Sequence, residues 1–151
     1  MNKATSFLLV DDDLDDTSLF GEILGEVSPF VALHSALNGQ EALNLLRSGN
    51  TKLPDVIFLD LNMPRMDGKQ CLYELKKDDT LKQIPVIMFT TSSQSKDIEQ
   101  TMQSGAVCFI TKPANIKELK IILSSIADNV HGNLERTLRT LSDTADTFIV
   151  C

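Results

Sequence analysis

The sequence predicts an α/β protein with a doubly wound, five-stranded parallel sheet. Five short apolar runs alternate with longer segments in which apolar residues recur at helical spacing. Three of the runs have almost no polar interruption, which is typical of strands buried on both faces. Strict alternation of strand and helix indicates parallel strands joined by right-handed crossovers.

The expected strands are four-residue apolar runs separated by turn signals such as Asn38-Gly39 and Asp67-Gly68. Glycine and asparagine at these points end one element and allow the chain to reverse. The expected strands cover residues 7–10, 30–33, 56–59, 86–89 and 107–110.

Each expected helix lies between two strands or after the last one, and each has one apolar face that can cover the sheet. The fourth helix has the weakest pattern and the fifth the strongest. The residues that indicate the five helices are, in chain order, Leu19, Phe20, Ile23, Leu24 and Val27; Ala42, Leu43, Leu45 and Leu46; Cys71, Leu72 and Leu75; Ile98 and Met102; and Ile116, Leu119, Ile122, Leu123 and Ile126.

Charge and cysteine content narrow the class of protein. Acidic residues outnumber basic ones by 21 to 14, which argues against binding nucleic acid by neutralising phosphates. Cys71, Cys108 and Cys151 are widely spaced and match no metal-binding pattern, so we expect a reduced, cytoplasmic protein. No segment has the length of a membrane span and the first residues lack a signal peptide, so we expect no membrane insertion.

Polar side chains follow several of the expected strands at the point where each strand ends. Asp11 and Asp12 follow the first strand, Asp60 the third, Thr90 the fourth and Lys112 the fifth. In open parallel sheets the carboxyl ends of the strands meet at one edge, which is where ligands bind. We therefore expect these five side chains to converge.

The expected cluster has the chemistry of phosphoryl transfer. Asp11, Asp12 and Asp60 offer the hard oxygen ligands that suit Mg²⁺, which is commonly held by a few carboxylates with waters and phosphate oxygens. A carboxylate can also act as a nucleophile and become an aspartyl-phosphate. Lys112 and Thr90 supply a cation and a hydroxyl for the remaining phosphoryl oxygens.

Four motifs, in this order and at these separations, resemble the receiver domain of two-component response regulators. They are FLLVDDD, VIFLDLNMPRMDG, PVIMFTTS and FITKP, and the resemblance covers roughly residues 5–128. It implies the flavodoxin-like receiver fold with strand order 2-1-3-4-5. It also implies a regulatory phosphoacceptor domain rather than an enzyme, whose partner is a sensor histidine kinase or a histidine phosphotransfer protein.

The resemblance implies a role for each matching residue. Asp60 corresponds to the phosphoacceptor, and Asp11 and Asp12 to the acid pair that holds Mg²⁺. The backbone carbonyl of Asn62 would complete the protein ligands of the metal. Thr90 corresponds to the switch hydroxyl.

Lys112 corresponds to the lysine of the family's phosphoacceptor site. The resemblance also implies a cis bond between Lys112 and Pro113, which would turn that lysine inward.

The residues that follow the last expected helix indicate a tail. Gly132 is a helix-stop signal, and Leu134, Leu138 and Leu141 form a short apolar stripe after it. We expect residues 1–130 to form the receiver domain. About twenty further residues are too few for an independent DNA-binding domain.

Residues 131–151 are therefore expected to form a C-terminal helical tail with no separate output domain. The apolar stripe favours packing of this tail on its own domain. The apolar residues 148–150 leave a dimer contact or a partner helix as the alternative, so the oligomeric state stays open.

We therefore expect a single-domain response regulator whose phosphorylation changes its protein contacts, with no nucleic-acid partner. An intermediate phosphate carrier in a phosphorelay is the first alternative. A haloacid-dehalogenase-type phosphatase is a second, but it needs an acid where Asn62 stands, to act as general acid–base, and the chain has no room for its cap domain.

The remaining acidic residues of the first motif have other interpretations. Asp13, Asp15 and Asp16 are expected to begin the first helix, where the helix dipole favours acidic side chains. An EF-hand loop that starts at Asp11 is disfavoured, because its sixth position is Asp16 instead of glycine and a strand precedes it. His34 and His131 are isolated, and we expect them to be structural or solvated.

Overall fold

A six-stranded sheet forms the centre of the molecule, in a computed structural model that describes residues 4–50 and 52–151. The strand order is β2-β1-β3-β4-β5-β6, and the first five strands are parallel. The predicted order 2-1-3-4-5 is therefore confirmed. The strands are β1 (Thr5–Val10), β2 (Val31–Ala36), β3 (Val56–Leu59), β4 (Val86–Thr90), β5 (Cys108–Thr111) and β6 (Ile149–Val150).

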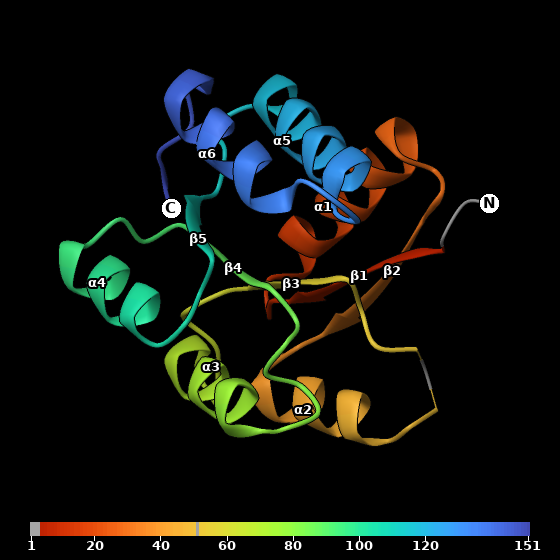
Figure 1. Ribbon diagram of the computed structural model, residues 1–151, viewed down its shortest axis with the longest axis vertical. Helices are drawn as coiled ribbons and strands as arrows, with labels where there is room; N and C mark the ends of the chain where they lie inside the picture. Colours follow the sequence, from red (N-terminus) through yellow and green to blue (C-terminus); the bar gives the residue numbers. More distant parts are fainter. Residues whose placement is uncertain (1–3, 51) are drawn as a thin grey trace.

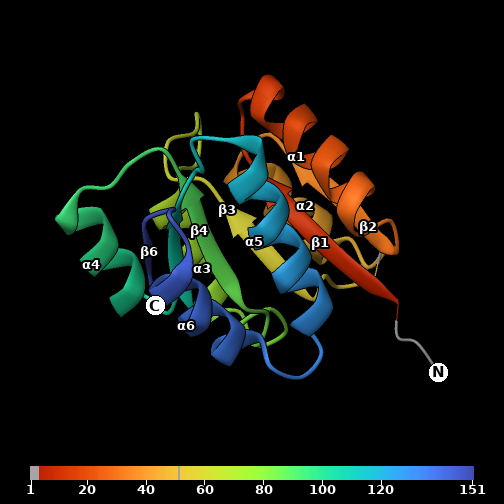
Figure 2. The same cartoon turned by 90° about the horizontal axis from the view of Figure 1, so that it is seen from above.

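The sixth strand was not predicted. β6 pairs antiparallel to β5, with Phe109 opposite Val150 and Ile110 opposite Ile149. Two apolar residues at the end of a polar tail give too short a pattern to identify a strand by period. The sheet thus contains the expected five strands and one short addition at its edge (Figure 2).

Burial on both faces explains the uninterrupted apolar runs of the central strands. Every residue of β1, β3 and β4 is buried, because helices cover both faces of these strands. The edge strand β2 is only partly buried, and it begins and ends later than its apolar run suggested. Polar residues His34 and Ser35 are tolerated there because one side of the strand faces solvent.

Helices form a layer on each face of the sheet (Figure 1). One layer consists of α1 (Leu14–Val27), α5 (Ile116–Asn129) and α6 (Leu134–Thr144), and the other of α2 (Gly39–Arg47), α3 (Gly68–Lys77) and α4 (Ser95–Gln103). Four of the helices start at an Asp or Asn whose side chain accepts a hydrogen bond from a backbone N–H of the first turn. These caps explain why the helix starts follow the polar turn signals so closely.

A cluster of aromatic rings fills the core under α1. Phe20 of α1 packs edge-on against Phe58 and Phe89, with ring centroids 5.1 and 5.6 Å apart. Phe7 lies 5.3 Å from Phe58. Such tilted and edge-to-face pairs are favourable beyond the area that they bury. The cluster joins α1 to three adjacent strands and so fixes the position of this helix on the sheet.

The tail packs on the same core. Leu134, Leu138 and Leu141 of α6 are buried together with residues of α5, as is Ile149 of β6. The segment between α6 and β6 is anchored by Glu118, whose carboxylate accepts hydrogen bonds from the N–H and the hydroxyl of Thr147 at 3.0 Å each. The apolar stripe of α6 therefore covers its own domain.

Within residues 4–50 and 52–151, the longest helices have 14 residues, and none is long and apolar enough to cross a lipid bilayer.

Gly68, the first residue of α3, provides a test of the packing beneath Asp60. A Cβ atom at this position would clash with the Asp60 carbonyl oxygen and lie 2.8 Å from the Leu61 Cα, and both are backbone atoms that cannot move aside cheaply. We expect Gly68→Ala to lower the free energy of unfolding by about 1–3 kcal/mol, measured by urea denaturation. Gly25→Ala in α1 is the matched control, since no atom lies within 4 Å of its added Cβ. This control should raise stability by about 0.5–1 kcal/mol, and equal effects of the two substitutions would contradict the packing argument.

The packing of α6 is tested by shortening one leucine. Leu138 is 1% exposed, so Leu138→Ala should leave a cavity and lower the free energy of unfolding by about 2–5 kcal/mol. Arg136→Ala, on the exposed side of the same helix, should change it by less than about 0.5 kcal/mol. Urea denaturation followed by circular dichroism measures both. A wild-type midpoint for Leu138→Ala would mean that α6 does not contribute to the core.

Candidate functional site

Three carboxylates meet at the carboxyl end of the sheet. Asp11, Asp12 and Asp60 each offer an oxygen that lies within 4.8 Å of the others. The sheet itself aligns two of them, because the Asp60 N–H donates to the Val10 carbonyl and the Asp11 N–H donates to the Ala36 carbonyl, both at 3.0 Å. Asp11 and Asp60 are buried, whereas Asp12 is exposed. The predicted cluster of acids is thus present.

Lys112 supplies the opposite charge. Its Nζ atom lies 2.8 Å from Asp11 and 3.8 Å from Asp60. The Lys112 N–H donates to the Thr90 carbonyl at 2.7 Å, which continues the pairing of β4 with β5 and directs the side chain to the acids. The position of Lys112 therefore follows from the register of the two strands.

The expected cis bond between Lys112 and Pro113 is wrong in this structure. The Lys112–Pro113 peptide is trans, since the described residues contain no cis bond. Because the hydrogen bond to Thr90 already sets the direction of the chain, the lysine reaches the acids without it.

The ionisation of the site follows from burial and pairing. Burial raises the pKa of Asp11, while the Lys112 ammonium and the N–H of Asp13 act in the opposite direction. Burial alone would lower the pKa of Lys112, but the carboxylates of Asp11 and Asp16 outweigh it and raise that pKa above its usual range. Lys112 is therefore held as a cation beside the acids.

Asp16 is a member of the site that sequence reasoning missed. Its carboxylate lies 2.7 Å from Lys112 Nζ, a shorter distance than the one to Asp60. The sequence predicts Asp13, Asp15 and Asp16 as helix-start residues, and Asp13 is indeed the cap of α1, since its carboxylate accepts a hydrogen bond from the Asp16 N–H. Side chains in the first turn of a helix lean back towards its N-terminus, and here that end lies at the sheet edge. That lean indicates that an acid of this turn can reach the site, although it does not distinguish Asp16 from Asp15.

Thr90 ends β4 and is completely buried. Its hydroxyl oxygen accepts a hydrogen bond from the Ser92 N–H at 3.4 Å. The Ser92 hydroxyl donates to Asp97 at 2.7 Å, and Asp97 pairs with Lys69 of α3 at 2.6 Å. Hydrogen bonds from Lys69 and Ser92 lower the pKa of Asp97, so this link stays ionic near neutral pH. The loop after β4 is thereby tied to the start of α3.

Asn62 lies in the segment between β3 and α3 and is exposed. This segment is tightly folded, because the Gly68 N–H donates to the Leu61 carbonyl and the Met66 N–H donates to the Pro64 carbonyl, both at 2.8 Å. The hydrogen bond from Met66 to Pro64 closes a three-residue turn with Arg65 at its centre. The φ of 67° at Arg65 is uncommon for a residue with a side chain. The segment returns the chain to α3 directly after the acid cluster.

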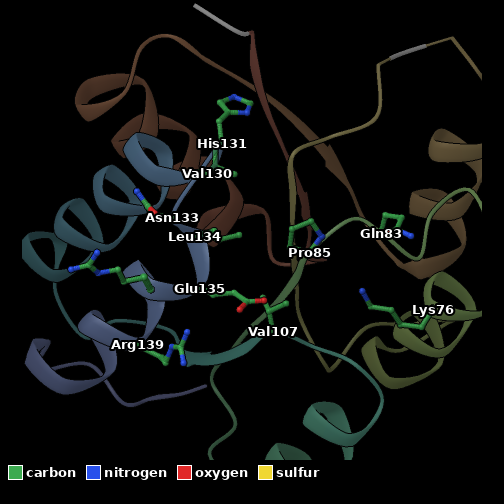
Figure 3. Close-up of a pocket in the computed structure, with 12 residues that line it drawn as sticks. Lys76, Gln83, Pro85, Val107, Val130, His131, Asn133, Leu134, Glu135 and Arg139 are labelled. Carbon is green, nitrogen blue, oxygen red and sulfur yellow. The ribbon is translucent and has the colours of Figure 1, made fainter.

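A cavity of about 580 Å³ lies at the other end of the sheet (Figure 3). Pro85 and Val107, which precede β4 and β5, line it together with His131, Glu135 and Arg139 from the α5–α6 turn and α6. None of the acids of the site lines this cavity. His131 is structural, as expected, since its Nε2 lies 2.9 Å from the Thr5 hydroxyl.

The donor set fits a hard divalent cation. The cluster offers carboxylate oxygens only, which is the ligand chemistry that Mg²⁺ and Mn²⁺ prefer. Asp12 is exposed, so an ion can enter from solvent and keep part of its water shell. Two buried carboxylates with a single ammonium between them leave negative charge for such an ion to neutralise.

Comparison with known proteins shows which sequences and structures this chain resembles. The sequence profile described as "Response regulator receiver domain" matches residues 7–124. The curated protein "Response regulator Rcp1" of Synechocystis sp. is 34% identical over 122 residues, which are 78% of this chain and 83% of that protein.

Two solved structures resemble most of the fold. The phosphorylated cyanobacterial phytochrome response regulator RcpA has a TM-score of 0.79 at 34% identity, covering 87% of this chain and 96% of its own. The Mn²⁺-bound form of response regulator Rcp1 has a TM-score of 0.74 at 32% identity, covering 83% of this chain and 93% of its own. The profile match extends over well more than half of the sequence, and the chain therefore belongs to the response regulator receiver domain family.

Proposed function

We propose that this chain is a stand-alone response regulator that accepts a phosphoryl group on Asp60 and then changes its protein contacts. Phosphorylation of an aspartate with Mg²⁺ is the general function of receiver domains, which are regulatory phosphoacceptor domains. The observation that carries the proposal is the position of Asp60 beside Asp11, Asp12 and the Lys112 ammonium.

The proposal assigns a role to each group of the site. An Asp60 carboxylate oxygen attacks the phosphorus, and the bond from phosphorus to the donor breaks with the electron pair leaving on the donor. Asp11, Asp12, Asp60 and the Asn62 carbonyl would hold Mg²⁺, which supplies charge neutralisation for the phosphoryl oxygens. The Lys112 ammonium pairs with another phosphoryl oxygen, and the Thr90 hydroxyl donates to a third.

Lys112 has to change partners for this to occur. Its ammonium lies closer to Asp16 and Asp11 than to Asp60 before phosphorylation. The added phosphoryl charge on Asp60 attracts the ammonium more strongly than a carboxylate does, so Lys112 releases Asp16. The Thr90 hydroxyl turns from the Ser92 N–H at the same time, which loosens the loop that Asp97 and Lys69 hold.

The partner that fits this chemistry is the phosphohistidine of a sensor kinase or of a histidine phosphotransfer protein. Receiver domains accept phosphoryl groups from histidine kinases. An excess of seven negative charges does not suit nucleic acid, so the output is proposed to be a protein contact in the cytoplasm. Onward transfer to a second histidine, as in a phosphorelay, uses the same site and is the alternative.

A phosphatase of the haloacid-dehalogenase type is disfavoured. Such an enzyme needs a second acid two residues after its nucleophile, and Asn62 stands there. Repeated turnover of a phosphate ester would identify a phosphatase, whereas a receiver takes up a single phosphoryl group per chain.

Phosphate uptake by Asp60→Asn tests the acceptor directly. With Mg²⁺ and radiolabelled acetyl phosphate, the wild type should incorporate label and Asp60→Asn should incorporate none, because an amide is not nucleophilic. The substitution keeps the acceptor atom for the Leu61 N–H, so the fold should persist and circular dichroism can verify it. Asp13→Asn, with the same loss of charge at a helix cap, should label normally. Undiminished labelling of Asp60→Asn would refute the assignment.

Mg²⁺ should stabilise the folded protein, because an ion that binds only the folded state raises its stability in proportion to the logarithm of ion concentration. We expect the thermal midpoint to rise with MgCl₂ relative to NaCl at equal ionic strength. Asp12→Asn should abolish most of this rise and, without Mg²⁺, should not lower the midpoint, since it removes one of three crowded negative charges. Asp13→Asn should respond to Mg²⁺ as the wild type does. Identical Mg²⁺ responses of Asp12→Asn and wild type would contradict the ligand assignment.

A further inference from the structure

Two of the three cysteines lie opposite each other at the edge of the sheet. The antiparallel register of β5 and β6 pairs Phe109 with Val150 and Ile110 with Ile149. One step further along this register, Cys108 of β5 is opposite Cys151, the residue that follows β6. Figure 2 shows β6 at this edge of the sheet.

The hydrogen-bond pattern gives Cys108 and Cys151 the closer of the two Cα spacings that occur in an antiparallel ladder. The Thr111 N–H donates to the Phe148 carbonyl at 3.0 Å, so Thr111 and Phe148 form a hydrogen-bonded pair. Pairs alternate along an antiparallel ladder, which makes Cys108 and Cys151 a non-hydrogen-bonded pair. The Cα atoms of such a pair are about 4.5 Å apart, within the range that a disulfide spans.

Both thiols also point to the same face of the sheet. Cys108 and Ile110 are buried in the core under α1 and α5, and Ile149 lies in that core opposite Ile110. Val150 packs into the other core, so the alternation of side chains returns Cys151 to the face of Cys108. We propose that Cys108 and Cys151 form a reversible disulfide that fixes the C-terminal segment to β5.

The two cysteines differ in a way that orders the reaction. Cys108 is completely buried, whereas Cys151 is exposed, so a dissolved reagent reaches Cys151 first. The Cys151 side chain and burial raise the pKa of Cys108, while the Cys108 thiol, and to a lesser extent Arg139, lower that of Cys151. Cys151 is therefore the better nucleophile of the pair.

The proposed reaction uses a low-molecular-weight disulfide such as glutathione disulfide as oxidant. The Cys151 thiolate attacks one of its sulfurs, the S–S bond of the reagent breaks, and one glutathione thiolate leaves. Cys108 then attacks the Cys151 sulfur of the mixed disulfide and gives its proton to the second departing glutathione. The protein loses two electrons and two protons, and one glutathione disulfide becomes two glutathione molecules.

The bond would act on a segment that otherwise has few anchors. Between α6 and Cys151, the tail is held by Glu118 through Thr147, by the hydrogen bond from the Thr111 N–H to the Phe148 carbonyl and by the two-residue pairing of β6. A disulfide closes the loop from β5 through α5 and α6, and so prevents α6 from leaving the core without unfolding of the sheet edge. Disulfides of cytoplasmic proteins are commonly transient and redox-sensing, which agrees with a reversible role.

Oxidation of the whole chain with glutathione disulfide tests the pairing. After removal of reagent and blocking of free thiols, trypsin digestion without reductant should yield segment 97–117 joined to segment 140–151. The intact protein should be lighter by a pair of hydrogen atoms and monomeric, and dithiothreitol should reverse both changes. Segment 70–76, which contains Cys71, should carry the blocking group after denaturation.

Single cysteine substitutions show which two thiols form the disulfide. Cys108→Ser should stop at the mixed disulfide and retain one glutathione on Cys151, whereas Cys71→Ser should oxidise as the wild type does, because Cys71 lies in the other core. Trypsin should cleave after Arg136 and Arg139 more slowly in oxidised than in reduced wild type, with no such difference in Cys108→Ser. Stable glutathione on Cys151 of the wild type, a disulfide-linked dimer, or a bond to Cys71 would each overturn the proposal.

Discussion

The ion pair between the buried Asp11 and the partly buried Lys112 is the interaction on which the site depends. Burial alone would drive Asp11 towards its neutral form, and Asp60 beside it adds like charge. The ammonium at 2.8 Å allows two carboxylates to stay close at the end of adjacent strands. The core supports this arrangement from below, because the aromatic cluster fixes α1 over the same strands. The lysine thus makes an acidic centre compatible with a folded sheet.

Much of the fold could be predicted because its signals are local. The runs that became β1, β3 and β4 are buried throughout, so composition alone identified them. The convergence of Asp11, Asp60 and Lys112 followed from topology, since parallel strands bring their carboxyl ends to one edge. Thr90 lies at the end of β4 as expected, and its carbonyl accepts the hydrogen bond from the Lys112 N–H that directs the lysine side chain to the acids.

The features that escaped prediction depend on contacts between distant segments. Asp16 joins the site through a lysine 96 positions later in the chain, and nothing in its local sequence distinguishes it from Asp15. β6 is defined only by its pairing with β5, because two residues carry no period. The trans bond before Pro113 is a further case, since the pairing of β4 with β5 had already determined where Lys112 points.

The short antiparallel strand has a consequence for self-association of the protein. An open sheet with two free edges can stack copies end to end without limit, as in fibrous aggregates. Here β6 covers β5 with only two paired residues, and so short an edge strand is a poor template for another strand. Pairing through β2 can join two copies about a twofold axis, and the joined sheet then ends in the short β6 strand of each copy. The residues of β6 therefore make this edge of the sheet unfavourable for open-ended growth.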